Sequence, residues 1–240
     1  MNKRFYFVAI FCGLCLVASF AGCSREVQQR QAFTRFLQKE VIPRNSGIYI
    51  PNTAMRKKLG IYATHYDVIV EHNKTMLERV GRPLEKLQRE YQDAVKPEAT
   101  TKERQAAIIK YRDALQAIAE DLDKVLAATE SEIVKLKQPE GLKETYTQTV
   151  EKHIRAPARI LKAMIPAIME MMSKNLELLD YIAANKGKVE IKDGMIQVDR
   201  NKDKDQSILT HLKKMQDEIH AMAQSIQEQH NEFTRQSIGK

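Results

Sequence analysis

Apolar residues recur at alternating spacings of three and four along most of the chain, which is the period of an amphipathic α-helix. A first stripe of this kind covers residues 25–41, and Pro43 is expected to end its helix. A second helix is predicted from about Ala54 to Gly81, with Thr53 as a possible N-cap and the glycine as its stop. The apolar faces of these two helices are predicted from Phe33, Phe36, Leu37 and Val41, and from Leu59, Tyr62, Tyr66, Ile69, Asn73, Met76 and Val80.

Further helices follow in the middle of the chain. A proline is tolerated at the first position of a helix, so Pro83 indicates a short helix that ends near Ala94. Thr100 and Glu103 have the spacing of a capping box and are expected to open the longest helix, which continues to about Lys137. The buried face of this helix is predicted from Ile108, Leu115, Ile118, Leu122, Val125, Thr129, Ile133 and Leu136.

The next stretch is more apolar. Pro139 is expected to begin one helix, and Ala156-Pro157 to begin or kink another. Residues 160–172 are apolar on nearly every side, which predicts a central helix, with Pro166 expected to bend it.

Residues 189–198 depart from the helical period. Asp193-Gly194 lies between two alternating runs, which is a strong signal for a β-hairpin that pairs Ile191 with Ile196 and places the apolar side chains on one face. A last helix is predicted from a near 3.5-residue seam of Ile208, Leu212, Met215, Ile219, Met222 and Ile226.

These elements predict a mainly α protein, an elongated helical bundle with one small β-hairpin before the last helix. The composition agrees, because the chain has no Trp, only 9 Gly and 7 Pro, and many strong helix formers. Three segments are expected: a signal peptide at 1–22, a lipidated basic arm with a short helix at 23–52, and a bundle domain with its hairpin at 53–240.

The first residues have the pattern of a secretory leader. Lys3 and Arg4 precede an uncharged apolar run over residues 5–20, which is shorter than the roughly 20 residues of a membrane-spanning helix. The run ends in Ser-Phe-Ala-Gly-Cys, which resembles a bacterial lipobox, so cleavage is expected between Gly22 and Cys23 and lipid attachment at the cysteine. An ordinary cleavable signal with a chance cysteine is the alternative.

Lipidation at Cys23 would anchor the chain without spanning the membrane. Lipoproteins of this kind with Asp directly after the cysteine tend to stay at the inner membrane, and Ser24 in that place favours the outer membrane, facing the periplasm. Cys12 and Cys15 lie inside the leader, so no redox or metal pair is expected from them.

The order of these parts resembles one bacterial family. The lipobox is followed by Gln28-Gln29-Arg30-Gln31-Ala32-Phe33, by Ala156-Pro157-Ala158 with Met164-Ile165-Pro166-Ala167, and by Asp193-Gly194-Met195-Ile196-Gln197. This arrangement is similar to that of the YiaF-like lipoproteins of enteric bacteria. The resemblance implies an envelope lipoprotein of a family without a known function, and it supplies no catalytic residues.

No residue pattern predicts an active site, a metal or a cofactor. His65 and His72 are seven residues apart on the predicted polar side of a helix, whereas a two-histidine clamp needs three or four. The Asp199, Asn201, Asp203 and Asp205 series lacks the glycine and the final glutamate of a calcium loop. Glu120, Asp121 and Asp123 are expected on a solvated helix face, and the methionines Met164, Met169, Met171 and Met172 either fill a core or line an adaptable groove.

The positive charge is concentrated next to the expected anchor. Eight basic and two acidic residues lie between Cys23 and Gly60, whereas basic and acidic residues balance from Ile61 onward. The side chains of Arg25, Arg30, Arg35 and Lys39 are therefore possible contacts with a phospholipid surface, the alternative being a solvated spacer. The apolar residues of this arm would face either the bilayer or the bundle.

Two classes of function remain open. One is a binding or scaffolding lipoprotein that presents its helices to an envelope protein, and the other is an envelope enzyme whose site is assembled from distant residues. A smooth bundle with one apolar groove would favour the first class, and a polar cleft with strongly perturbed acids would favour the second. Nucleic acid is not an expected partner for a secreted chain, despite the formal net charge of +8.

Overall fold

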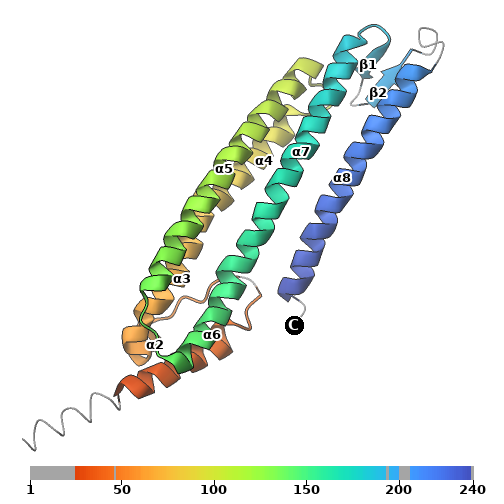
Figure 1. Cartoon of the computed structure of the whole chain (residues 1–240). Coiled ribbons are helices and arrows are strands. Elements are labelled where there is room, and N and C mark those ends of the chain that lie inside the picture. Colours follow the sequence, from red (N-terminus) through yellow and green to blue (C-terminus); the bar gives the residue numbers. More distant parts are fainter. Residues whose placement is uncertain (1–24, 46, 193–194, 200–205, 239–240) are drawn as a thin grey trace, which may run out of the picture. The chain divides into compact units, whose positions relative to one another are not determined.

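The computed structural model describes residues 25–45, 47–192, 195–199 and 206–238, without the side chains of 232–238. Helices dominate these residues, and the predicted hairpin is their only sheet (Figure 1). Residues 25–36 form the first helix, and the further elements are η1 (Leu37–Val41), α2 (Thr53–Leu59), η2 (Gly60–Tyr62), α3 (Ala63–Met76), η3 (Leu77–Gly81), α4 (Arg82–Ala94), α5 (Thr101–Lys135), α6 (Glu140–Val150), η4 (Glu151–Arg155), α7 (Ala156–Ala184), β1 (Val189–Lys192), β2 (Met195–Val198) and α8 (Ser207–Ile238).

The chain forms two compact units. Unit 1 contains the described residues up to Asn73 together with Thr129–Arg155, and unit 2 contains Lys74–Ala128 together with the described residues from Ala156 onward. The chain therefore passes from one unit to the other inside α3, inside α5 and at the start of α7.

The core of unit 1 is rich in aromatic side chains. The first helix, α3 and α6 all contribute to it, and Tyr62 and Tyr66 are its largest fully buried residues. The other buried hydrophobic residues are Phe33, Phe36, Leu37, Val41, Leu59, Ala63, Ile69, Leu142, Tyr146, Val150 and Ile154.

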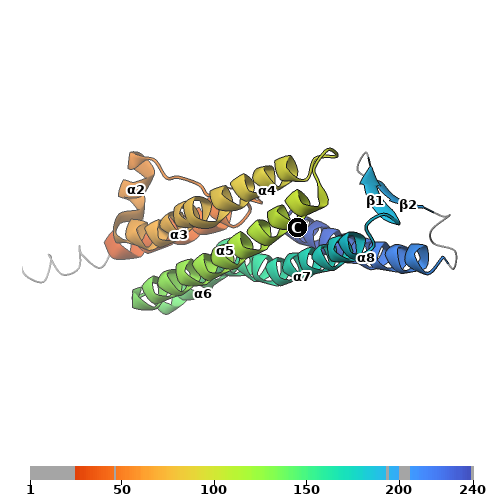
Figure 2. The same ribbon diagram turned by 90° about the horizontal axis from the view of Figure 1, so that it is seen from above.

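The core of unit 2 is mainly aliphatic. It is built from α4, α5, α7 and α8, and α8 packs along α7 in both views (Figures 1 and 2). The predicted seam of α8 is confirmed for its first four residues, because Ile208 and Leu212 are buried while Met215 and Ile219 pack against the core.

The predicted hairpin is confirmed in its register. Val189 pairs with Val198 and Ile191 with Ile196, and all four side chains pack into the core of unit 2. The turn residues 193 and 194 lie outside the described residues. Burial alternates along both strands, because successive side chains of a strand point to opposite faces of the sheet.

The predicted capping box at the start of α5 is also confirmed. The backbone N–H and the hydroxyl of Thr100 donate to Glu103 Oε2 at 2.8 and 2.7 Å, and the Glu103 N–H donates to Thr100 Oγ1 at 3.3 Å. The expected cap of α2 is wrong by one residue, because Asn52 Oδ1 and not Thr53 accepts the N–H of Met55.

The expected helix stop at Gly81 is wrong. This glycine has helical backbone angles, φ −62° and ψ −56°, and the chain continues through the π turn η3 directly into α4. In that turn the Arg82 N–H donates to the carbonyl of Leu77, five residues back. Pro83 lacks an N–H and its ring would collide with the carbonyl four residues earlier in a regular helix, so the wider turn keeps the path helical.

The same combination occurs at each of the three π turns of the described chain. The turns η1, η3 and η4 end at residues 41, 81 and 155, and a proline stands two residues later each time, at Pro43, Pro83 and Pro157. Pro166 differs, because it lies inside α7 without a π turn. A wider turn just before a proline is one way for the backbone to avoid the clash with the proline ring, and a proline follows each of the three π turns.

The expectation that residues 160–172 form a fully enclosed helix is only partly met. Within α7 the side chains of Ile165 and Met172 are buried, whereas Lys162, Ala163 and Pro166 are exposed. The helix buries one side against its neighbours in unit 2 and leaves the other accessible.

Gly60 joins α2 to η2 at a point where no other residue fits well. Its φ is +58°, and a Cβ at this position would lie 2.0 Å from the side chain of Gln29 in the first helix. The close approach lets the first helix pack directly against this connection.

We predict that Gly60→Ala lowers the free energy of unfolding by about 1–3 kcal/mol, because the new methyl group forces a strained φ and displaces Gln29. Gly141→Ala is the matched control, since Gly141 lies in α6 and a methyl group added there would meet nothing within 4 Å. Urea unfolding of both variants measures the effect. Equal stability of the two would show that the connection at Gly60 adapts freely.

Candidate functional site

The predicted anchor residues Gly22 and Cys23 lie outside the described residues, so their role stays a prediction. The predicted surface residues lie on or just after the first helix. Arg25, Arg35 and Lys39 are exposed and Arg30 is half-buried. These side chains are accessible to a negatively charged surface.

The apolar side of the first helix faces the protein. Phe33 stacks on Tyr62 with ring centroids 5.7 Å apart and an angle of 11° between the planes. Phe36 meets the ring of Tyr66 edge-on at 4.9 Å, and Leu37 is fully buried. Of the two expectations for these residues, packing on the bundle is the one the structure bears out, so the expected arm is part of unit 1.

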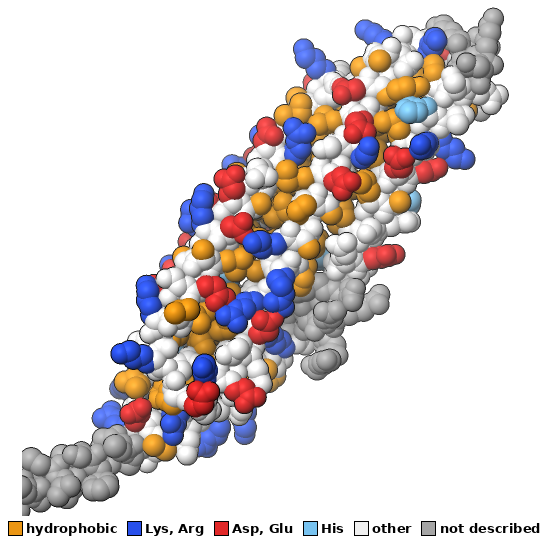
Figure 3. Space-filling view, in the orientation of Figure 1, with side chains coloured by type: hydrophobic (Ala, Val, Ile, Leu, Met, Phe, Trp, Pro, Cys, Tyr) orange, Lys and Arg blue, Asp and Glu red, His pale blue; other side chains and the backbone are white. Residues whose placement is uncertain are grey.

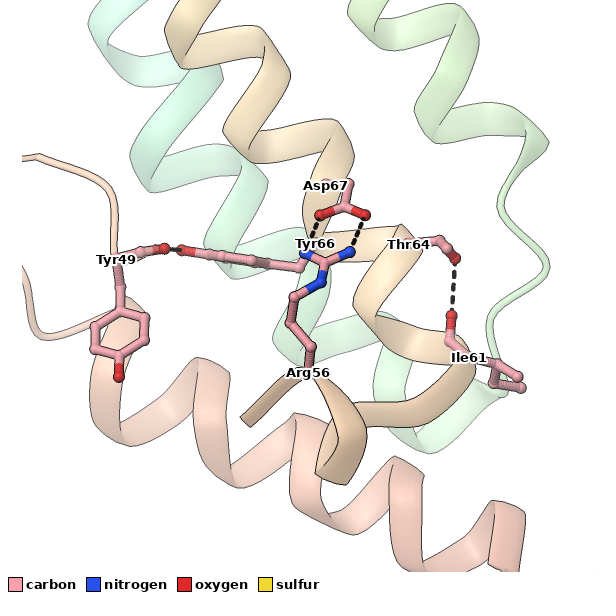
Figure 4. A network of polar contacts seen from close by, with 6 residues as sticks. All are labelled: Tyr49, Arg56, Ile61, Thr64, Tyr66 and Asp67. Carbon is pink, nitrogen blue, oxygen red and sulfur yellow. Dashed lines mark hydrogen bonds and ion pairs between the residues drawn. The ribbon is translucent and has the colours of Figure 1, made fainter. Parts of the chain in front are cut away.

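A polar network surrounds the entrance to α3 (Figure 4). The guanidinium of Arg56 makes two parallel hydrogen bonds to the carboxylate of Asp67, at 2.6 and 2.7 Å. The hydroxyl of Tyr66 donates to the carbonyl of Tyr49 at 2.8 Å. These bonds connect α2 and the preceding connector to α3, and they pair the positive charge of Arg56 with Asp67.

Three histidines of unit 1 are buried or half-buried, which corrects the expectation that His65 and His72 lie on a polar face. His72 is only 5% exposed and is hydrogen bonded through Nδ1 to Thr129 Oγ1 at 2.8 Å. His65 lies edge-on to Phe33, and His153 donates through Nε2 to the carbonyl of Val41. The sequence pattern did not predict the burial of His65 and His72, because α3 buries two adjoining faces and not a single apolar one.

Burial determines the protonation of these histidines. Desolvation lowers the pKa of His72 to about 4, although nearby Glu130 acts in the opposite direction. Desolvation also lowers the pKa of His65 and of His153. Glu130 itself has a lowered pKa, first because Arg155 donates to it at 2.7 and 2.8 Å. Burial therefore favours the uncharged form of each of these histidines, and Glu130, which lies near His72, is paired with Arg155.

The acidic residues of α5 do not form a paired-acid site. Asp121 makes ion pairs with Arg79 and Lys124, and Asp123 makes one with Lys162. Glu120 accepts a hydrogen bond from Gln116. Across the described ranges, no three His, Cys, Asp or Glu side chains are grouped so that they could hold a metal ion.

Unit 2 contains a shallow, mainly apolar groove between α5 and α7. Its volume is about 450 Å³, and Asp123 and Lys162 border it. The remaining lining residues are Gln116, Ala119, Leu122, Ile165, Pro166 and Met169. Figure 3 shows hydrophobic side chains interspersed with charges of both signs on the face that carries these helices. Of the four methionines considered in the sequence, only Met169 lines this groove.

The described residues thus define a helical protein with an apolar groove in unit 2 and exposed basic side chains on its first helix. The chain belongs to the family described as protein of unknown function (DUF3053), whose model matches residues 11–236. This agrees with the resemblance noted from the sequence.

The relatives in enteric bacteria are described as uncharacterized. The chain is 25% identical over 176 residues to the "Uncharacterized protein YiaF" of Escherichia coli strain K12, which covers 71% of this chain and 72% of the relative. The proteins of the same description in Escherichia coli O157:H7 and Shigella flexneri match to the same extent. No solved structure matches the chain. Among the described helices, none has the length and apolar character needed to cross a bilayer.

We predict that unit 1 loses stability in mild acid. The unfolded chain binds a proton on His72 below about pH 6.5, whereas the folded protein does so only near pH 4, so the free energy of unfolding falls as the pH decreases between these values. His65, His153 and Glu130 act in the same direction. His72→Gln should remove about 2 kcal/mol of the change between pH 7 and 4.5.

Urea unfolding at a series of pH values measures this loss. The control is His220→Gln, because His220 is exposed on α8 in unit 2. An unchanged pH dependence in His72→Gln would show that this histidine does not carry the effect.

Proposed function

We propose that this protein is a lipoprotein of the bacterial cell envelope, attached through lipid on Cys23 and presenting its helices to an envelope protein as a binding or scaffolding module. The observation that carries the proposal is the position of the first helix. It is already formed at residue 25, two residues after the lipobox cysteine, and its apolar face is built into the core of unit 1. A lipid at Cys23 would therefore hold a folded unit close to the bilayer.

The attachment is proposed at the periplasmic face of the outer membrane. The support is sequence alone, because Ser24 stands where an aspartate tends to retain such proteins at the inner membrane. Three acyl chains would make release from the bilayer negligible, at about 0.8 kcal/mol per buried CH₂.

The acids of the described chain support binding in preference to catalysis. The carboxyl groups with a shifted pKa are Glu90, Glu103 and Glu130, and each pKa is lowered by a hydrogen-bonding partner: Lys110, Thr100 and Arg155 respectively. A general acid at neutral pH needs a raised pKa. The mainly apolar groove between α5 and α7 would then receive an apolar segment of a partner protein.

We predict that Cys23→Ala abolishes the incorporation of labelled palmitate and releases the protein from the membrane fraction. Radiolabelling followed by fractionation of cells measures both. Cys15→Ala is the matched control, because Cys15 lies in the expected leader and should not affect labelling. Persistent labelling without Cys23 would refute the anchor.

We also predict that a photoreactive amino acid in place of Gln116, at the groove of unit 2, cross-links to a distinct envelope protein in intact cells. The same replacement at Gln227, an exposed position of α8, is the control. Mass spectrometry identifies the product. Identical products at both positions would argue against specific binding in the groove.

A further inference from the structure

Two exposed apolar side chains of unit 1 come from segments far apart in the sequence. Val27 on the first helix is 40% exposed, and Ile61 in η2 is 58% exposed. The side chain of Ile61 points away from the polar network of Tyr66 and Asp67 (Figure 4). Isolated exposed apolar residues are ordinary on protein surfaces, so their setting decides whether these two have a role.

Three contacts hold the two segments together. The hydroxyl of Tyr62 donates to Glu26 Oε1 at 3.3 Å, and the side chain of Gln29 fills the space beside Gly60. The rings of Phe33 and Tyr62 stack on the inner side. The residues on both sides of Ile61, Gly60 and Tyr62, therefore contact Gln29 and Glu26, which lie next to Val27 in the first helix.

The charges around these segments are almost all positive. Arg25, Lys57 and Lys58 are exposed, and none of them forms an ion pair within the described ranges. The acids that contact these segments are Glu26, which accepts the hydrogen bond from Tyr62, and Asp67, which is paired with Arg56. The unpaired basic side chains thus lie within four residues of the exposed apolar ones in the sequence, which is the composition of surfaces that rest on anionic lipid.

The position of the chain end adds a constraint. Arg25 follows Cys23 by two residues, and consecutive Cα atoms are about 3.8 Å apart, so the first helix cannot lie more than about 8 Å from the cysteine. This step rests on the proposed lipid anchor. With the anchor in place, the first turn of the helix lies at the level of the phospholipid head groups.

We propose that Arg25, Val27, Lys57, Lys58 and Ile61 form a membrane-contact surface of unit 1, which rests on anionic phospholipid with the two apolar side chains inserted between head groups. Lipid phosphates complement the basic side chains. A second copy of the chain on the same surface would oppose like charges, so it fits this surface less well.

Fluorescence can test the contact, because the chain contains no Trp. The Ile61→Trp variant of the full chain, purified from cells and reconstituted, carries one tryptophan at the proposed contact. In vesicles of brominated phosphatidylcholine with phosphatidylglycerol we expect a blue shift and quenching. The Ile109→Trp variant is the control, since Ile109 is 43% exposed on α5 in unit 2 and should be quenched at least about twofold less.

Charge reversal tests the electrostatic part. Combined Lys57→Glu and Lys58→Glu in the Ile61→Trp background should cut the quenching by about half or more in phosphatidylglycerol vesicles, and high salt should do the same to the parent. The matched control is the adjacent exposed pair in α8, Lys213→Glu with Lys214→Glu, which should leave quenching unchanged. Thermal unfolding confirms that every variant is folded.

Palmitate labelling of the same samples separates this inference from the anchor. Labelled protein with an unquenched tryptophan overturns the contact surface and leaves the anchor standing. Unlabelled protein that is still quenched by anionic vesicles supports the surface and overturns the anchor. A blue shift that depends on protein concentration and not on lipid overturns the inference in favour of a second copy.

Discussion

The stacking of Phe33 on Tyr62 is the interaction on which the arrangement of unit 1 depends. It joins the first helix to the residues around α3, and Phe36, His65 and Tyr146 surround the same pair of rings. Aromatic pairs contribute about 0.5–1.5 kcal/mol beyond the burial of their area. Together with the edge-on contact of Phe36 with Tyr66, this stacking packs the basic helix against the folded unit. With it, the charges next to Cys23 have fixed places on a folded surface.

Much of the fold follows from local patterns. The stripes of α3 and α5, the capping box at Thr100 and the hairpin register were predictable, because each depends on a few residues close together in sequence. The continuous helical path through Gly81 was not predictable, because it depends on how the backbone accommodates Pro83. In the π turn the Arg82 N–H bonds to a carbonyl five residues back instead of four, and the spacing of apolar side chains does not predict such a turn.

The candidate site was harder to predict than the fold. The basic residues near Cys23 were visible in the composition, but their relation to Lys57, Lys58 and Ile61 depends on the Gln29 contact at Gly60. His65 and His72 carried a usable signal, since both are spaced three or four residues from buried Ile69. A histidine at such a spacing can be either buried or exposed, and the prediction of an exposed face rested on the polarity of the side chain instead of its spacing. The division into two units was hidden because unit 1 is assembled from two separate stretches of chain.

That discontinuity affects how the protein is made. The side chains that close the core of unit 1 include Tyr146 and Ile154, and His153 bonds to Val41 across more than a hundred residues. Loops of this length close slowly compared with neighbouring helices. The residues that complete the core of unit 1 follow α4 and most of α5 in the sequence, so the aromatic side chains of the first helices are fully enclosed only when these later residues reach them. Folding of unit 1 is therefore complete only when the stretch that ends at residue 155 has joined the first helices.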